Sequence, residues 1–442
     1  MKPAKPFSAT MDEQTFVPPT MRALYYTMPA AGNKTNSSRQ GEEHRTLVFD
    51  SDFPVPRQSP SQYLIKVLTA AFSHDEVHLA RSLNPTQCMP QIPLHNICGT
   101  VISTPSQDHW STEGPKFKVD EVVFGLVSYA RDGGAADYIL ATEDELAFKP
   151  KNISATEAAT VPLPALSAWK ALFTYGGLEP GGDDNSTVHG NHKRNTSSIS
   201  STNSTSSSQS SLSKISRSLS NSSNNGRKLH TKHRNHTLRI LITNAGGSET
   251  AVQALHLLRS TSLFPCNNGN GDNQSPKPWV CVTCTSTEQA TRIRTQEASI
   301  NEIIVAPFPR ATDFDLAAIF RDNHWEPVDI VLDCAGGQVL RQTYSPYIVR
   351  DYGTVLTAVD HGLAQYPDKG NGMDRGLVRR FVAVEPDGET LGRIAGLIEE
   401  GSVRGRAAKV VDLIHGQDVL GNVGVDAVKG GEMIVVRVNA YS

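Results

Sequence analysis

The sequence lacks any uninterrupted apolar run of about 18 residues, so it predicts no membrane-spanning helix. Its first residues, MKPAKPFSATMDEQTFVPPT, have neither the apolar centre of a secretory signal nor the Arg-rich amphipathic pattern of a transit peptide. A net charge of −3 and a pI near 6.5 give no general attraction to nucleic acid or to an anionic membrane. From these absences we expect a soluble, cytoplasmic protein.

Cysteine is also scarce, with six residues in a chain of 442. Cys281, Cys284 and Cys334 lie inside apolar, strand-like runs, which favours reduced and buried thiols. The pair Cys281-Val-Thr-Cys284 has the spacing of a redox or metal motif, but no second pair completes a zinc cage. We therefore interpret the pair as two buried positions of one strand.

Apolar residues make up only 38% of the chain, and the deficit is local. Residues 1–20 are rich in polar side chains and proline, and residues 183–237 consist mostly of Ser, Asn and Thr. Such segments cannot bury enough apolar surface to offset the entropy lost on ordering, so we expect a disordered tail and a disordered insertion. The insertion is either a tolerated surface expansion, which we favour, or a regulatory loop for kinases.

Two regions with different periodicity flank the insertion. From residue 21 to about 160, short strand-like runs are separated by Gly, Pro and Asp, which predicts a β-rich domain. The runs are MRALYY, QYLIKVLTAAF, CGTVIST, DEVVFGLV and AADYILA. Ser154 and Glu157 then form a predicted capping box that opens a helical stretch ending at Gly176.

After the insertion, apolar strands alternate with helical patterns such as TAVQALHLLRS and DLAAIFRDN. This alternation predicts an α/β fold with a parallel, doubly wound sheet covered on both faces. The predicted strands are LRILIT, WVCVTC, NEIIVAP, VDIVLDC, GTVLTAV and RRFVAVEP.

A short glycine loop joins the first of these strands to its helix, in the order Ala245-Gly246-Gly247-Ser248-Glu249-Thr250. Such a loop lets the backbone approach a pyrophosphate closely, and the helix N-terminus supplies N–H groups. The hydroxyls of Ser248 and Thr250 could donate further hydrogen bonds. Glu249 opposes an anion unless it points away or pairs with a cation. We interpret the loop as a real but weakened dinucleotide site.

The end of the second strand lacks the Asp or Glu that usually holds an adenosine ribose. Thr285, Ser286 and Thr287 stand there instead, with Arg292 and Arg294 downstream. Hydroxyls and arginines suit a 2′-phosphate, which favours NADP(H), although NAD(H) stays possible. The alternative is that both arginines are solvated helix residues.

The order of these pieces resembles the medium-chain dehydrogenase/reductase superfamily, and its quinone or enone reductases most. The resemblance rests on the runs FGLVSYARDGGAADYILATEDELAFKP, AATVPLPALSAWKAL and VDIVLDCAGG, and covers residues 21–182 and 237–442. It implies a GroES-like catalytic domain over 21–160 that 408–442 complete, and a Rossmann domain over 161–407. Cofactor and substrate would share the cleft between the domains, and a homodimer is possible.

Zinc-dependent members of that family bind their catalytic metal with Cys, His and Cys. The corresponding positions here are Ser73, His95 and Ala165, and Leu94 and Asn96 flank the histidine. A hydroxyl and a methyl cannot replace two thiolates, so the resemblance implies no metal. His95 is then either satisfied internally or faces the substrate.

Without zinc, the resemblance favours reduction of a conjugated carbonyl, a quinone or an enone. Hydride can add to such a substrate, and the developing oxyanion needs only hydrogen bonds and a proton. One alternative is a family member that binds cofactor poorly and acts as a scaffold or regulator. Missing ligands argue against a second alternative, a zinc alcohol dehydrogenase.

The resemblance also assigns site residues. Ser167 stands where the family's threonine contacts the nicotinamide region, and Asn244 to Thr250 would face the pyrophosphate. Ser73 and Tyr129 are candidate catalytic residues of the substrate cleft, with packing as the other reading. The residues expected near the nicotinamide and its ribose are Cys334, Ala335, Gly336, Thr357 and Ala358.

Overall fold

The structure is a computed structural model that describes ten ranges of the chain. They are residues 17–27, 46–72, 90–106, 114–180, 237–265, 277–296, 300–306, 314–359, 375–420 and 433–439. The expected disordered tail and insertion, 1–20 and 183–237, lie almost wholly outside these ranges. Within the described ranges, every helix is too short or too polar to span a bilayer.

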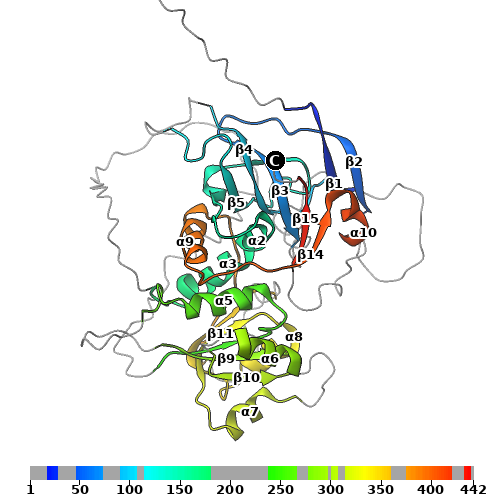
Figure 1. The fold of residues 1–442 in the computed structure, drawn as a ribbon. Helices are drawn as coiled ribbons and strands as arrows, with labels where there is room; N and C mark the ends of the chain where they lie inside the picture. Colours follow the sequence, from blue (N-terminus) through cyan, green and yellow to red (C-terminus); the bar gives the residue numbers. More distant parts are fainter. Residues whose placement is uncertain are drawn as a thin grey trace, which may run out of the picture.

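The β-rich part contains a seven-stranded sheet in the order β14-β15-β3-β4-β5-β7, with β6 paired to β3. Strand β15, near the end of the chain, pairs antiparallel with β3, so the C-terminal strands complete the first sheet (Figure 1). A separate antiparallel pair joins β1 to β2. The bounds are β1 Thr20–Thr27, β2 Thr46–Pro54, β3 Tyr63–Phe72, β4 Asn96–Ser103, β5 Val122–Leu126, β6 Tyr138–Ala141, β7 Leu146–Phe148, β14 Ala407–Asp412 and β15 Met433–Arg437.

The second part is a six-stranded sheet in which each neighbouring pair is parallel, as the sequence predicts. Its order, β10-β9-β8-β11-β12-β13, reverses direction between β8 and β11. In a doubly wound sheet, the ligand crevice lies at that reversal, outside the carboxyl ends of the strands. The bounds are β8 Arg239–Ile242, β9 Trp279–Cys284, β10 Glu302–Val305, β11 Val328–Asp333, β12 Val349–Thr357 and β13 Val378–Phe381.

Both faces of this sheet are buried, which explains why its strands read as continuous apolar runs. In β8, Ile240 and Ile242 belong to one hydrophobic core and Leu241 to another on the opposite face. The helices of this part are α5 Glu249–Arg259, α6 Thr287–Gln296, α7 Leu316–Asp322, α8 Gly337–Thr343 and α9 Gly388–Glu399. The cysteines of β9, Cys281 and Cys284, are buried free thiols, as expected.

The predicted helical stretch after Ser154 is divided into three pieces. The capping box is confirmed, because Ser154 Oγ accepts from the Glu157 amide at 3.2 Å and the Glu157 carboxylate accepts from the Ser154 amide at 2.9 Å. The first helix ends early, since Pro162 cannot continue it and opens a new one. The pieces are α2 Ala155–Ala159, α3 Pro162–Trp169 and a π-helical segment Lys170–Tyr175, and α10 Gly416–Leu420 lies near the C-terminus.

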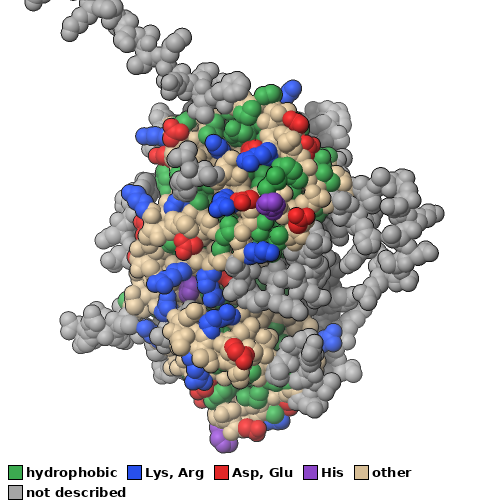
Figure 2. All heavy atoms as spheres, turned by 45° about the vertical axis from the view of Figure 1, so that its right-hand side comes forward, with side chains coloured by type: hydrophobic (Ala, Val, Ile, Leu, Met, Phe, Trp, Pro, Cys, Tyr) green, Lys and Arg blue, Asp and Glu red, His purple; other side chains and the backbone are tan. Residues whose placement is uncertain are grey.

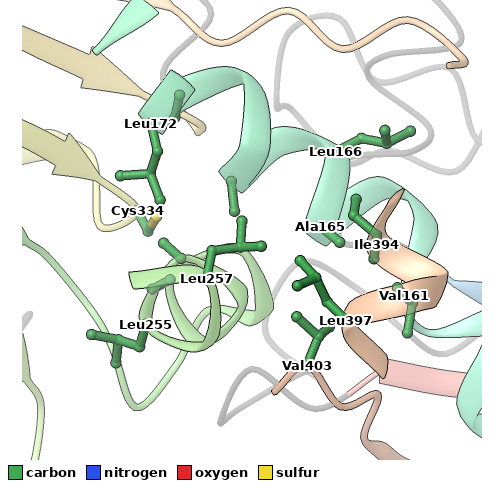
Figure 3. Packing of buried hydrophobic residues seen from close by; sticks show 14 of the residues in the cluster. Val161, Ala165, Leu166, Leu172, Leu255, Leu257, Cys334, Ile394, Leu397 and Val403 are labelled. Carbon is green, nitrogen blue, oxygen red and sulfur yellow. The ribbon is translucent and has the colours of Figure 1, made fainter. Parts of the chain in front are cut away.

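An apolar layer joins the two parts of the molecule. Figure 3 shows side chains of α3, α5 and α9 meeting there, with Ala165, Leu257 and Ile394 among those labelled. All three are fully buried in one continuous core. Helix α5 therefore packs against the strands on one side and against α3 on the other, which fixes the position of its N-terminus.

We expect Leu257→Ala to lower the free energy of unfolding by about 2–5 kcal/mol, because it removes buried methyl groups from this layer and leaves a cavity. The measurement is the midpoint of urea unfolding. The control is Val305→Ala on edge strand β10, where the side chain is 37% exposed and the loss should be below about 1 kcal/mol. Equal losses for the two variants would contradict this description of the layer.

Candidate functional site

A buried carboxylate, Asp333, lies where three neighbouring strands end. It is fully buried at the end of β11 and accepts the hydroxyl of Thr243 at 2.8 Å and that of Thr357 at 2.9 Å. Thr243 directly follows β8, and Thr357 ends β12. One side chain thereby links the carboxyl ends of all three strands at the reversal of the sheet.

Asp333 also shapes the turn that follows β11. Its carboxylate accepts from the amides of Ala335 at 3.2 Å and Gly336 at 3.1 Å. Gly336 has a φ of 69° and Gly337 a φ of 53°, which glycine adopts without strain. Burial raises the pKa of Asp333 above its ordinary value, while these donors pull that pKa downward. Asp333 was not among the sequence candidates, although a charged residue at the end of an apolar strand was a usable signal.

The glycine loop is held against the neighbouring strands by Asn244. This residue has a left-handed φ of 56°, and its amide N–H donates to Thr283 Oγ1 at 3.0 Å. Its side-chain Nδ2 donates to the carbonyl of Cys334 at 3.1 Å, across the reversal between β8 and β11. The amide of Gly247 donates back to the Asn244 carbonyl at 3.0 Å, which closes a tight turn.

Both loop glycines are packed against side chains of the protein itself. A Cβ added at Gly246 would stand 2.5 Å from Gln289 Oε1, and one at Gly247 would stand 2.4 Å from Asn244 Oδ1. A side chain at either position would have to displace Gln289 or Asn244, so packing alone favours glycine there, whether or not a ligand binds. This internal use was missed, because the sequence does not show which side chain approaches the loop.

Helix α5 begins directly after this turn and has 11 residues. Ser248 is its N-cap, and the Ser248 hydroxyl accepts from the amide of Ala251 at 3.3 Å. Thr250 lies half-buried in the first turn. Glu249, the first residue of the helix, is only 8% exposed, and its Oε1 lies 3.8 Å from Nη2 of Arg406. The carboxylate thus pairs with a cation, one of the two conditions under which it does not oppose an anion.

At the end of β9, the predicted hydroxyl cluster opens helix α6. The amide and hydroxyl of Thr285 both donate to Gln289 Oε1 at 2.9 Å, and Ser286 Oγ accepts from the Gln289 amide. Thr287, the first residue of α6, is exposed. Arg292 reaches from this helix to the carbonyl of Gly246 at 3.3 Å. The structure therefore places one arginine between the second strand end and the glycine loop.

The other predicted residues lie in α3, at the ends of β11 and β12, or outside the described ranges. Ser167 is 6% exposed in α3 and donates to the Leu163 carbonyl at 2.7 Å. Cys334 is buried and Ala335 exposed, while Ala358 is half-buried. Burial raises the pKa of the Cys334 thiol to about 12, so this thiol stays protonated. Ser73 lies outside the described residues.

His95 and Tyr129 form a buried pair in the β-rich part. The His95 ring lies 4.4 Å from the Tyr129 ring, and its Nε2 contacts the carbonyl of Arg131 at 3.1 Å. Since a carbonyl only accepts, Nε2 carries the hydrogen and is not free to bind a metal. Ala165, at the second predicted cysteine position, is fully buried. Among the described residues no group of three His, Cys, Asp or Glu side chains could hold a metal ion.

A separate groove of about 770 Å³ lies between α3, the 3-10 turn Glu143–Glu145 and the start of α9. None of the residues predicted to bind cofactor lines it. Its carboxylates outnumber its two lysines, Lys116 and Lys170, so it does not suit a diphosphate. The acidic residues are Glu143, Asp144, Glu385, Asp387 and Glu389.

The glycine loop, by contrast, fits a pyridine dinucleotide. An 11-residue helix begins there at the reversal of the sheet, and its dipole favours negative charge. Arg292 and Arg406 flank that helix start and supply positive charge. Near the end of β9, the exposed carboxylate of Glu288 is hydrogen-bonded to Ser286 and Thr287, which lowers the pKa of Glu288 and adds a negative charge that a 2′-phosphate would have to face.

Thr357→Val tests the linkage of the three strand ends. Because the buried carboxylate of Asp333 loses a donor, we expect the free energy of unfolding to fall by about 1–3 kcal/mol. The lost donor also raises the pKa of Asp333 further, so the destabilisation should be larger at about pH 8 than at about pH 5, where more of the carboxyl is neutral. Thermal unfolding at both pH values is the measurement. The control Thr357→Ser keeps the hydroxyl, and a loss as large as that of the valine variant would contradict the role of the bond.

No protein-family model matches the chain, but individual known proteins are similar to it in sequence or in fold. A protein of Arthroderma benhamiae named "Probable zinc-binding oxidoreductase, mitochondrial" is 24% identical over 96% of this chain and 100% of its own length. The 2-methylene-furan-3-one reductase of Solanum lycopersicum is 31% identical, and the mitochondrial NAD(P)H oxidoreductase RTN4IP1 of Dictyostelium discoideum is 27% identical. These two alignments cover 28% and 30% of this chain, and 33% and 38% of the relatives.

Among solved structures, the quinone oxidoreductase of Coxiella burnetii superposes with a TM-score of 0.60 at 15% identity. The match covers 95% of this chain and 99% of that one, so it shows a common fold. The resemblance seen in the sequence is confirmed by the full-length relative and by this fold. The chain thus has the fold of the medium-chain dehydrogenases/reductases, and the relatives to which its sequence is similar are named as oxidoreductases.

Proposed function

We propose that this oxidoreductase uses NADP(H), works without zinc, and reduces a conjugated carbonyl, a quinone or an enone, by hydride transfer. The observation that carries the proposal is the start of α5 at the reversal of the sheet, flanked by Arg292 and Arg406. A helix start in that position favours an anionic ligand, and two guanidinium groups offset the charge of Glu249. The names of the relatives, an NAD(P)H oxidoreductase and a quinone oxidoreductase among them, agree with this chemistry.

The preference for NADP(H) rests on the end of β9. Thr285, Ser286 and Thr287 replace the acidic residue that would bind a free ribose 2′-hydroxyl. Arg292 is fixed beside them, with its Nη2 on the Gly246 carbonyl at 3.3 Å. A guanidinium is planar and positively charged, a combination that suits a phosphate. We therefore assign Arg292 to the 2′-phosphate.

The nicotinamide, when bound, would supply the hydride. The residues of this chain would orient it and complete the site: the Asp333 network fixes the turn after β11 and the end of β12, next to the expected ring position. Ser167, whose proton is engaged by the Leu163 carbonyl, can offer a lone pair toward the ring. We assign Ser73 and Tyr129 to the substrate cleft, where a hydroxyl could stabilise a developing oxyanion.

Zinc independence rests on the donor set. His95 engages the Arg131 carbonyl through Nε2, and Ala165 offers only a methyl group. The name of the full-length relative includes zinc binding, which makes metal content the sharpest point of difference from that protein. Two of the relatives are named as mitochondrial, so the cytoplasmic location, like the homodimer and the kinases acting on residues 183–237, stays a prediction.

One observation favours the alternative of a scaffold or regulator that binds cofactor poorly. The side chains of Gln289 and Asn244 fill the space beside Gly246 and Gly247 that a phosphate would approach. In that alternative, the loop glycines serve packing alone. Cofactor affinity therefore decides between the two functions.

We expect the purified protein to bind NADPH with a dissociation constant of about micromolar order, because the start of α5 favours the diphosphate and Arg292 the 2′-phosphate. Titration followed by nicotinamide fluorescence measures it, and elemental analysis of the same sample should find substoichiometric zinc. Absence of binding at about millimolar NADPH would support the scaffold. One zinc per chain would contradict zinc independence.

Arg292→Ala should weaken NADPH binding by about tenfold and leave NADH binding nearly unchanged, since only NADPH carries the 2′-phosphate. The matched control is Arg294→Ala, which removes the same charge from an exposed position of the same helix. It should change neither affinity by more than about twofold. An equal loss for both nucleotides in Arg292→Ala would show that Arg292 does not select the 2′-phosphate.

A further inference from the structure

The segment that crosses from the parallel sheet back to the β-rich part is fastened to helix α5. Gln253 Nε2 donates to the carbonyl of Arg404 at 2.7 Å, and His256 Nδ1 accepts from the Arg404 amide at 3.4 Å. Near the other end of the helix, Arg259 donates to the carbonyl of Ser402 at 3.4 Å. These bonds fix the backbone of the crossover beside the helix whose N-terminus forms the proposed cofactor site.

Arg406 extends from this crossover to the start of the same helix. Glu249, Gln253 and His256 are spaced four and three residues apart, so they share one face of α5. On that face, Glu249 Oε1 lies 3.8 Å from Arg406 Nη2. The chain therefore brings a cation to its altered glycine loop from a segment that lies far downstream in the sequence.

The guanidinium of Arg406 is not saturated by these contacts. Its Nη1 lies 3.4 Å from Gln296 Oε1, so both of its polar contacts are long for charged hydrogen bonds. Its Nε is buried and has no hydrogen-bond partner in the described part of the chain. Protein atoms enclose Nε, so a ligand would contact the guanidinium at its Nη groups, whose contacts with Glu249 and Gln296 are the long ones. The Arg406 side chain is 34% exposed, which leaves part of it open to solvent.

Positive charge also gathers where the β-rich part meets the parallel sheet. Figure 2 shows Lys and Arg side chains gathered on the visible face where the β-rich part meets the parallel sheet. An anionic ligand would be attracted to such a region before any specific contact forms.

We propose that Arg406 binds the diphosphate of the cofactor, and that the carboxylate of Glu249 competes with the diphosphate for this guanidinium. This assignment rests on the proposed function and names a residue on the interdomain crossover as part of the cofactor site. Arg406 would supply positive charge that the short loop lacks and that offsets the carboxylate of Glu249. Because the crossover leads directly into β14 of the β-rich part, cofactor binding would also restrain that connection.

The two members of the pair should then act in opposite directions. Arg406→Met is expected to raise the dissociation constants of both NADPH and NADH by about tenfold, because each carries the diphosphate. Glu249→Gln removes the opposing carboxylate and should lower both constants, by about threefold. The readout is nicotinamide fluorescence on the purified full-length protein, with thermal unfolding to confirm that each variant is folded.

Two further variants serve as controls. Arg404→Met removes the same charge two residues away, from an exposed side chain, and should change neither constant by more than about twofold. Arg406→Lys keeps a cation without the planar fork and should bind both nucleotides with intermediate affinity, which covers the case in which the methionine variant does not fold.

Each remaining outcome overturns the assignment. Weaker binding by both Glu249→Gln and Arg406→Met would show that the ion pair stabilises the fold and that Arg406 does not contact the ligand. A loss confined to NADPH would place Arg406 at the 2′-phosphate. Binding by Arg406→Met equal to that of the wild type overturns this inference alone, whereas absence of binding by the wild type overturns the proposed function and this inference with it.

Discussion

The site depends on one buried carboxylate. Asp333 is excluded from water at the reversal of a parallel sheet, where an isolated charge would be costly. Hydroxyls from two neighbouring strand ends and two amides of the following turn donate hydrogen bonds to this carboxylate. Removing any one of these donors would leave the buried charge less well satisfied and would destabilise the fold. The carboxyl ends of β8, β11 and β12 therefore have a fixed geometry before any ligand binds, which is the condition for positioning a cofactor against a substrate.

The glycine loop shows how an unfavourable residue can be compensated from a distance. Glu249 stabilises the start of α5 through the helix dipole, but it puts negative charge next to a proposed diphosphate site. Arg406, on the crossover, offsets that negative charge. Gln253 fixes the crossover backbone by donating a hydrogen bond to the Arg404 carbonyl. The loop, the helix and the connection between the two sheets thus form a single unit.

Much of the fold was predictable from the sequence, because its signals are local. The apolar runs of the parallel sheet, the capping box at Ser154 and the buried thiols of β9 each follow from a few adjacent residues. The site was less predictable, since its decisive contacts join distant positions. The packing of Gln289 against Gly246 and the pairing of Arg406 with Glu249 depend on how helices meet, which no local pattern encodes. Strand β2 was also missed, because its run TLVFDSDFP mixes polar and apolar residues without a clear alternation.

A crystal structure of the protein with NADPH would test the central claim most directly. We expect a diphosphate at the first turn of α5, within hydrogen-bonding distance of the Arg406 guanidinium, and a 2′-phosphate beside Arg292. A crevice without nucleotide at saturating NADPH, or a Glu249 carboxylate turned into the diphosphate position, would contradict it.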